Sequence, residues 1–198
     1  MKHLFIALLF ALLPSAYAEE ITPVIQIGWG GGGFSVNPAA AKSAGKNPGL
    51  LFAAWADGKI VWSRDPNKGG APFLTARLDS AKINGLLERW SKVGELGDPQ
   101  FPCFYSGPDS SFLKIALRLD GKTIEWASWH EGFESNPNLV ALPGITSLDG
   151  RSREELLKGA PPEFLRFRGI WKDLRDSTAA LIPDQGEPYA EEIPILKK

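Results

Sequence analysis

The sequence predicts an α+β fold: an antiparallel sheet built from two β-hairpins, with helices packed on one face. Three observations predict it. An Asp-Gly pair lies between two β-prone runs at residues 57–58 and again at residues 120–121, and this pair favours a hairpin turn because both positions tolerate positive φ. The second hairpin places its large apolar side chains on one face, which is typical of a sheet with one wet side. Apolar residues at helical spacing follow each hairpin.

The first hairpin is expected to join the runs on either side of residues 57–58 through a two-residue loop, which would set Trp55 opposite Ile60. One face would then carry Leu51, Ala53, Trp55, Ile60 and Trp62. A helix is expected next, because Asp79 is a good N-cap and Gly94 suits a helix end. Its apolar stripe consists of Ile83, Leu86, Leu87, Trp90 and Val93.

The second hairpin is expected to pair residues 112–119 with residues 122–129, with Leu117 opposite Ile124. Its apolar face consists of Leu113, Ile115, Leu117, Leu119, Ile124 and Trp126. The opposite face is polar and is expected to contact water.

Two helices are expected near the end of the chain. Ser152 and Glu155 have the spacing of a capping box, and Gly159 would end this short helix. A longer helix begins near Pro162 and ends at Pro183. Its apolar stripe consists of Phe164, Phe167, Ile170, Trp171 and Leu174.

The chain begins with the pattern of an export signal. Lys2 precedes an apolar run over residues 4–13, a proline breaks this run, and an Ala-x-Ala site ends at Ala18. Residues 1–18 are therefore predicted to be a signal peptide, cleaved after Ala18, which would make the protein periplasmic or extracellular. The run is too short to span a bilayer and no later segment approaches that length, so no transmembrane segment is expected in the mature chain.

The mature chain is expected to have three parts. Residues 19–49 are rich in Gly, Ala and Pro and predict a mobile N-terminal segment. Residues 50–183 would form a single α+β domain and residues 184–198 a polar tail. The one cysteine, Cys103, cannot form an intrachain disulfide, so packing must supply stability. Without Lys2 there are 21 basic and 23 acidic residues, and no basic stripe, so nucleic acid is not an expected partner.

Three glycines resemble a cofactor motif. Gly28, Gly30 and Gly33 match the G-x-G-x-x-G pattern of dinucleotide sites, which requires a helix directly after the glycines. Pro38, in a low-complexity stretch, argues against that helix. A turned or flexible glycine loop is the preferred interpretation, and no cofactor is expected.

Catalysis by histidine would depend on His130, the only histidine of the mature chain. With Glu131 beside it and Asp109 before the second hairpin, an exported hydrolase using His130 and nearby carboxylates is the alternative hypothesis. Two-carboxylate glycosidase chemistry stays open, although no pattern marks a pair of acids. Cys103 could be a nucleophile paired with His130, but its apolar neighbours are typical of a buried thiol. A His–carboxylate metal site could also include Glu134, yet the H-E-x-x-H pattern is absent, and no metal is expected.

Four aromatic residues do not fall on a predicted core face: Trp29, Phe34, Trp129 and Phe133. Exposed aromatic side chains on a sheet often mark a contact with a protein or a sugar. Trp129, on the polar face of its hairpin, is the principal candidate for binding, with Phe133 and Trp29. The competing interpretation is that a helix or the N-terminal segment covers them.

The layout resembles that of small secreted bacterial proteins of unknown function, in which an Asp-Gly hairpin precedes a helix and a second Asp-Gly-Lys hairpin. The matching parts are Ala-Asp-Gly-Lys-Ile-Val-Trp-Ser at residues 56–63, the helix over 79–93 and Leu-Asp-Gly-Lys at 119–122. This resemblance implies an envelope protein and assigns no catalytic residue. The favoured hypothesis is an exported, non-catalytic domain that binds a protein or glycan in the envelope or outside the cell.

Overall fold

The computed structural model describes residues 22–31, 47–92, 104–105, 111–137, 140–141 and 150–196. Within these residues the chain forms an antiparallel sheet of seven strands together with four helices, which confirms the predicted α+β class. The sheet has more strands than two hairpins supply. Several features named above lie outside the described residues: the leader at 1–18, Gly33, Phe34, Val93, Gly94, Cys103 and Asp109.

The strand order is β7-β6-β1-β2-β3-β4-β9, with every neighbouring pair antiparallel. These strands are β1 (Ile25–Gly31), β2 (Leu50–Ala54), β3 (Lys59–Ser63), β4 (Phe73–Arg77), β6 (Ser111–Leu119), β7 (Lys122–Ser128) and β9 (Glu187–Tyr189). A separate pair joins β5 (Phe104–Tyr105) to β8 (Val140–Ala141). The helices are α2 (Ser80–Ser91), α3 (His130–Ser135), α4 (Arg153–Lys158) and α5 (Pro162–Ala179). In the described ranges no helix has both the length and the hydropathy of a membrane span.

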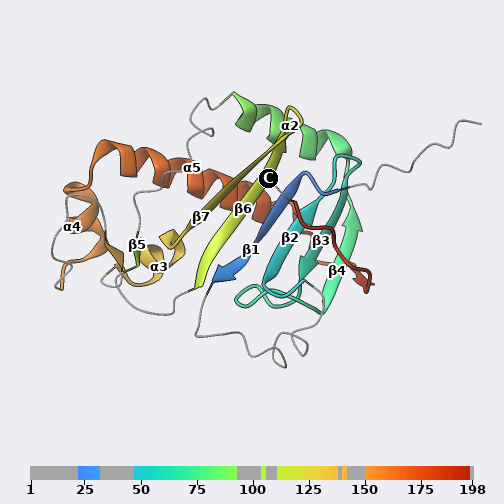
Figure 1. The fold of residues 1–198 in the computed structure, drawn as a ribbon, viewed down its shortest axis with the longest axis horizontal. Coiled ribbons are helices and arrows are strands. Elements are labelled where there is room, and N and C mark those ends of the chain that lie inside the picture. Colours follow the sequence, from blue (N-terminus) through green and yellow to red (C-terminus); the bar gives the residue numbers. More distant parts are fainter. Residues whose placement is uncertain are drawn as a thin grey trace, which may run out of the picture.

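One face of the sheet packs against helices, and α5 and α2 lie behind the strands in Figure 1. Side chains from both layers form the main core. The strands contribute Ile25, Ile27, Ile60, Leu113, Ile115 and Leu117. The helices contribute Ile83, Trp90, Phe133, Leu156, Phe164 and Trp171. Each large apolar side chain removed from water in this way contributes about 1.5–3 kcal/mol to folding.

The opposite face of the sheet, which we call the tail face, carries a second cluster made by Ala53, Trp55, Val61, Phe73 and Ile193. The end of the chain crosses this face, as the red trace in front of the strands shows (Figure 1). The tail was expected to be polar, but β9 pairs with β4, and Ile193 and Leu196 are buried. Periodicity misses this contact because only two aliphatic residues, three apart, are buried in a segment rich in Glu and Pro.

The two hairpins differ in how well the sequence predicts their register. In the second, Leu117 lies opposite Ile124 as expected, and Asp120 and Gly121 have positive φ values of 49° and 75°, as a type I′ turn requires. In the first, Ile60 lies opposite Ala54 rather than Trp55.

The first hairpin has a three-residue loop, because the Trp55 N–H donates to the carbonyl of Lys59 (2.9 Å). Asp57 does not take positive φ; its carboxylate instead accepts from the Lys59 N–H (3.1 Å), and only Gly58 is left-handed, at φ 92°. A one-residue shift moves side chains to the other face of a sheet. The prediction that Ala53 and Trp55 share a face with Ile60 and Trp62 is therefore wrong.

The glycine-rich segment continues a strand where a loop was expected. β1 runs to Gly31 and pairs with β2 on one side and β6 on the other. Pairing with β6 through Gly31, and with β2 as far as Gly28, holds this backbone extended although its glycines have low strand propensity. A Cβ at Gly30 would lie 3.0 Å from the side chains of Phe112 and Lys114, so the missing side chain leaves room for theirs. Gly28 and Gly30 therefore lie within a strand and not in a phosphate-binding loop.

Local capping signals place the starts of α2 and α4 as expected, whereas α3, which has no side-chain cap, was not predicted. The Asp79 carboxylate accepts from the Ala81 N–H (2.9 Å) at the start of α2. Both hydrogen bonds of a capping box join Ser152 and Glu155 at the start of α4. α5 has proline in its first turn and ends at Ala179, before the proline that was expected to end it. These termini depend on neighbouring residues alone, which is why the sequence predicts them.

Replacing Gly58 with alanine should lower the free energy of unfolding by about 2 kcal/mol, because positive φ costs about 1 kcal/mol for alanine and the new Cβ would overlap the carbonyl oxygen of Leu78. Gly121 is the matched control, since it has positive φ but no atom within 4 Å of an added Cβ. Gly121→Ala should cost about 1 kcal/mol. Urea unfolding of the two variants measures both values; equal losses would show that the Leu78 overlap has no effect.

Candidate functional site

His130, the residue on which the hydrolase hypothesis depends, begins α3 and is 1% exposed. Aromatic rings surround the imidazole, with ring centroids 5.5–6.2 Å away: Phe133, Phe164, Phe167 and Trp171. Nε2 lies 2.9 Å from Oε1 of Glu134, and because a carboxylate only accepts, Nε2 carries the proton. Nδ1 has no hydrogen-bond partner among the described residues. Burial lowers the pKa of His130 below 6.5 despite the nearby carboxylates, so the ring is held neutral.

Glu134 connects α3 to the two C-terminal helices. Its carboxylate accepts two hydrogen bonds from Arg168 of α5 (2.6 and 3.1 Å) and one from Arg153 of α4 (3.2 Å). Burial alone would raise the pKa of Glu134, but the Arg168 hydrogen bonds and the neighbouring charges outweigh it, and the net shift is downward from 4.5. Glu134 is therefore an ionised anchor whose oxygens are already used by protein partners.

Glu131, the proposed carboxylate partner of His130, makes different contacts. Its Oε1 accepts from Trp171 Nε1 and from Arg175 Nε, both at 3.0 Å. A hollow of about 260 Å³ lies along α3 and α5, and His130, Glu131 and Glu134 are among the residues that line it. Among the described residues no group of three His, Cys, Asp or Glu side chains is arranged to hold a metal ion. Asp109 lies outside the described residues, so its place beside His130 stays a prediction.

These contacts form a network that fixes α3 on α5. A general base must reach a substrate proton at hydrogen-bond distance, and the His130 ring is enclosed by aromatic side chains. Both carboxylates are paired with arginine. A sequence cannot show this burial, because most of the rings around His130 come from α5.

Acid should destabilise the fold in two separate pH ranges. The lowered pKa of His130 means that the unfolded chain takes up a proton first as the pH falls below about 6.5, so stability declines there. The stability that Glu134 contributes is present above about pH 4.5 and is lost as the pH falls through its lowered, folded-state pKa. Urea unfolding from pH 8 to pH 3 measures both. His130→Gln should flatten only the upper range, since the other histidine, His3, lies in the predicted leader.

The aromatic candidates for binding occupy three different environments. Phe133 is fully buried in the main core, so it is a core residue and not an exposed binding candidate. From α3 its ring packs against Phe164 of α5. Trp29 is half-buried and packs against the same core. Trp129 is also half-buried, and its ring meets Phe112 edge-on at 5.4 Å. Trp129 is therefore partly accessible to solvent in its pair with Phe112, whereas Phe133 is inaccessible.

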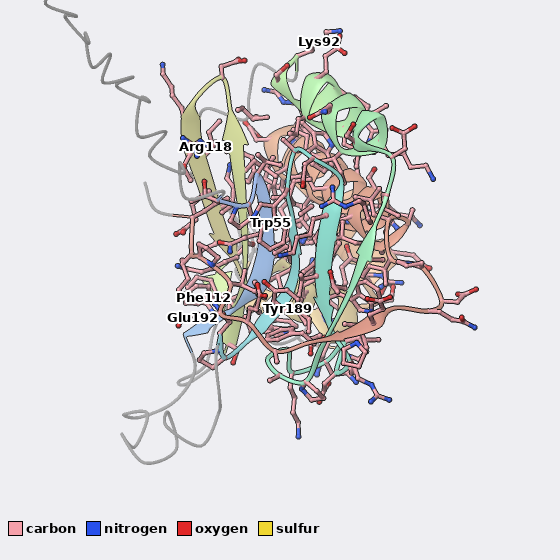
Figure 2. All side chains as sticks on the ribbon, turned by 90° about the vertical axis from the view of Figure 1, so that its right-hand side faces the viewer. Trp55, Lys92, Phe112, Arg118, Tyr189 and Glu192 are labelled. Carbon is pink, nitrogen blue, oxygen red and sulfur yellow. The ribbon has the colours of Figure 1, made fainter. Side chains whose placement is uncertain are left out.

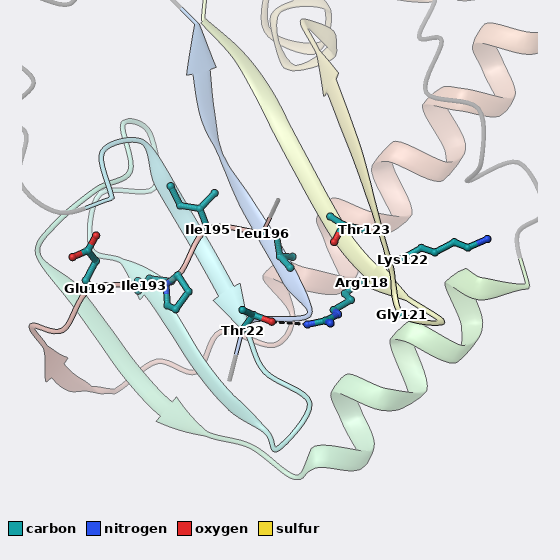
Figure 3. A pocket seen from close by; sticks show the side chains of 10 residues that line it. Thr22, Arg118, Gly121, Lys122, Thr123, Glu192, Ile193, Ile195 and Leu196 are labelled. Carbon is teal, nitrogen blue, oxygen red and sulfur yellow. Dashed lines mark hydrogen bonds between the residues drawn. The ribbon is translucent and has the colours of Figure 1, made fainter. Parts of the chain in front are cut away.

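A groove that sequence patterns do not indicate lies on the tail face. It has a volume of about 910 Å³ and lies between the tip of the β6–β7 hairpin and the end of the chain (Figure 3). Its lining consists of Thr22, Arg118, Gly121, Lys122, Thr123, Glu192, Ile193, Pro194, Ile195 and Leu196. Figure 2 shows Arg118 and Glu192 on the side of the sheet away from the helices.

The groove combines basic and aliphatic groups. Arg118 donates to the Thr22 hydroxyl (2.7 Å), and within the described residues neither Arg118 nor Lys122 forms an ion pair. Ile195 is 66% exposed, although it is a large aliphatic side chain. The only signal in the sequence was Ile-Pro-Ile-Leu at residues 193–196, an aliphatic run in a tail otherwise judged polar.

Comparison of the chain with family models, with curated proteins and with solved structures gives no match. Function must therefore be inferred from the residues of this chain and their geometry.

Proposed function

We propose that the protein is an exported, non-catalytic domain that binds a protein partner in the cell envelope or outside the cell. The observation that carries the proposal is the groove on the tail face, where exposed Ile195 adjoins Arg118 and Lys122. Protein interfaces combine a desolvated apolar centre with a polar rim. The N-terminal pattern of an export signal supports the location, as does the resemblance to small secreted bacterial proteins.

The composition of the groove favours a protein partner over the other expected class, a glycan. No aromatic residue lines it, and the aromatic candidates Trp29 and Trp129 lie elsewhere. Small-molecule sites are mostly enclosed by apolar and aromatic side chains, whereas this groove is open and half polar. The hydrolase alternative is less favoured: His130, Glu131 and Glu134 line the hollow along α3 and α5, but the ring is 1% exposed and both carboxylates are paired with arginine.

Site-specific photo-crosslinking in the native envelope tests the proposal. A benzoylphenylalanine at Lys122, on the groove, should give a discrete protein adduct, whereas the same group at Glu163 on α5 should not. Adding Arg118→Glu should remove the adduct without changing the thermal midpoint, since Arg118 is exposed. Adducts of equal yield at both positions, or none at Lys122, would contradict a partner at this groove.

Export itself has a direct test. The protein recovered from the cell envelope or medium should begin at Glu19, and intact mass measurement shows this to the residue. Ala18→Arg should block cleavage, because signal peptidases require a small residue there. A secreted chain that retains residues 1–18, or a chain confined to the cytoplasm, would refute this part of the proposal.

A further inference from the structure

Two side-chain amides bind the main chain of the C-terminal segment, residues 190–196. Gln26 donates from Nε2 to the carbonyl of Pro194 (2.6 Å) and accepts at Oε1 from the N–H of Leu196 (2.7 Å). Asn47 donates to the carbonyl of Ile193 (2.6 Å) and accepts from its N–H (2.9 Å). Each amide donates one hydrogen bond to the segment and accepts one from it, as a residue does in backbone pairing between two strands. Contacts of this kind recognise an extended chain whatever its side chains are.

Side-chain recognition is confined to two positions of this segment. Ile193 is 1% exposed and packs in the tail-face cluster, and Leu196 is also buried. Between them Pro194 is half-buried and Ile195 is exposed. Proline is acceptable at 194 because only its carbonyl is bound. The site therefore selects an extended segment with aliphatic residues three positions apart.

The end of the chain is held by different contacts before and after residue 190. β9 is paired with β4, and the Lys59 ammonium lies over the Tyr189 ring (4.6 Å) and the Trp55 ring (4.8 Å). Residues 190–192 are exposed, and residues 193–196 are held by the two amides and by the two buried aliphatic side chains. Release of residues 190–196 would leave β9 and the sheet in place.

We infer that this part of the tail face is a peptide-binding site in which residues 190–196 are the resident ligand, and that an extended segment of the partner, with aliphatic residues three positions apart, takes their place. This inference rests on the proposed function, since it names how the protein partner is recognised. The groove beside Ile195 then provides the open side along which the partner's chain approaches.

A tethered ligand competes strongly with a free one. A short flexible tether gives an effective concentration in the millimolar range, so the unaltered protein should bind an added peptide weakly. Ile193→Asp removes the buried anchor while leaving Gln26 and Asn47 unchanged. The Ile193→Asp protein, which we call the released variant, should therefore bind the same peptide at least about tenfold more tightly than the unaltered protein does.

The test uses the full chain and a fluorescein-labelled peptide of residues 190–198, with fluorescence anisotropy as the readout. Ile195→Asp is the matched control, because it places the same charge two residues away on an exposed side chain and should leave the segment bound. A peptide carrying Ile193→Asp should not bind the released variant. Adding Gln26→Met to the released variant should weaken binding by about tenfold, the loss of two hydrogen bonds.

If the released variant is less stable, its thermal midpoint should rise on adding peptide, as binding to the folded state requires. Equal weak binding by the released variant and the unaltered protein would overturn the inference, as would a variant that stays unfolded with peptide present. The groove crosslinks are measured separately in the envelope. If the crosslinks are lost while the released variant still binds the peptide more tightly than the unaltered protein, the proposed partner is refuted. If the crosslinks are present but the released variant binds no more tightly, only this mode of recognition is refuted.

Discussion

Replacing Phe164 with alanine should lower the free energy of unfolding by about 4 kcal/mol, the largest effect expected of any single change discussed. Phe164 is fully buried on α5, and its ring centroid lies 5.4 Å from that of Phe133 and 5.7 Å from that of His130. Truncation would remove apolar contacts and leave a cavity among rings that come from two helices, which relax only partly. Urea or guanidinium unfolding, with a constant m-value, measures the loss.

Leu165 provides the control, since it is the next residue of the same helix but is 43% exposed. Leu165→Ala should change the free energy of unfolding by no more than about 0.5 kcal/mol. A similar loss in both variants would mean that α5 is stabilised by helix propensity and not by its buried face. Retention of full stability in Phe164→Ala would contradict the packing of α3 against α5.

The stripe that contains Phe164 shows which features a sequence can predict. Helical spacing places Phe164, Phe167 and Trp171 on one face, and all three are buried. The capping residues of α2 and α4 are equally predictable from sequence, because each hydrogen bond joins residues two or three apart. The second hairpin followed from its Asp-Gly turn and its apolar face. All of these signals are local, so they need no knowledge of the tertiary structure.

The errors arise where distant segments decide the outcome. Whether a glycine-rich run becomes a strand depends on neighbours that complete its hydrogen bonds. Gly28 pairs with both β2 and β6, and Gly30 and Gly31 pair with β6. The loop length of the first hairpin depends on an Asp57 side-chain contact that propensity does not include. The burial of Ile193 depends on a cluster formed about 130 residues earlier in the chain.

The candidate site likewise has features that the sequence predicts and features that only the tertiary structure shows. The sequence placed His130 beside carboxylates, and Glu134 does contact it. It could not show that aromatic rings of α5 enclose the imidazole or that Arg168 neutralises Glu134, because these partners belong to another helix. Chemistry-bearing residues are found by sequence, but their exposure decides between catalysis and structure, and exposure is a tertiary property.

Glu134→Ala should lower the free energy of unfolding by about 3 kcal/mol, because it leaves two buried or half-buried partners without their acceptor. Nε2 of His130 would lose its only described hydrogen bond, and Arg168 would lose both of its contacts to Oε1 and Oε2. The loss should shrink as the pH falls through the lowered pKa of Glu134, since protonation already weakens the Arg168 pair in the unaltered protein.

Glu88→Ala tests whether this loss reflects the network or merely the loss of a helical glutamate. Glu88 makes an i,i+4 pair with Lys92 on α2 in which both side chains are exposed, and such pairs contribute only about 0.3–0.5 kcal/mol. The two variants should therefore differ by about 2 kcal/mol or more at neutral pH. Glu134→Gln should recover part of the loss, because its amide oxygen can still accept from Arg168. Equal effects of Glu134→Ala and Glu88→Ala would mean that α3 is held by its aromatic contacts alone, and that the charged network around His130 adds nothing to the fold.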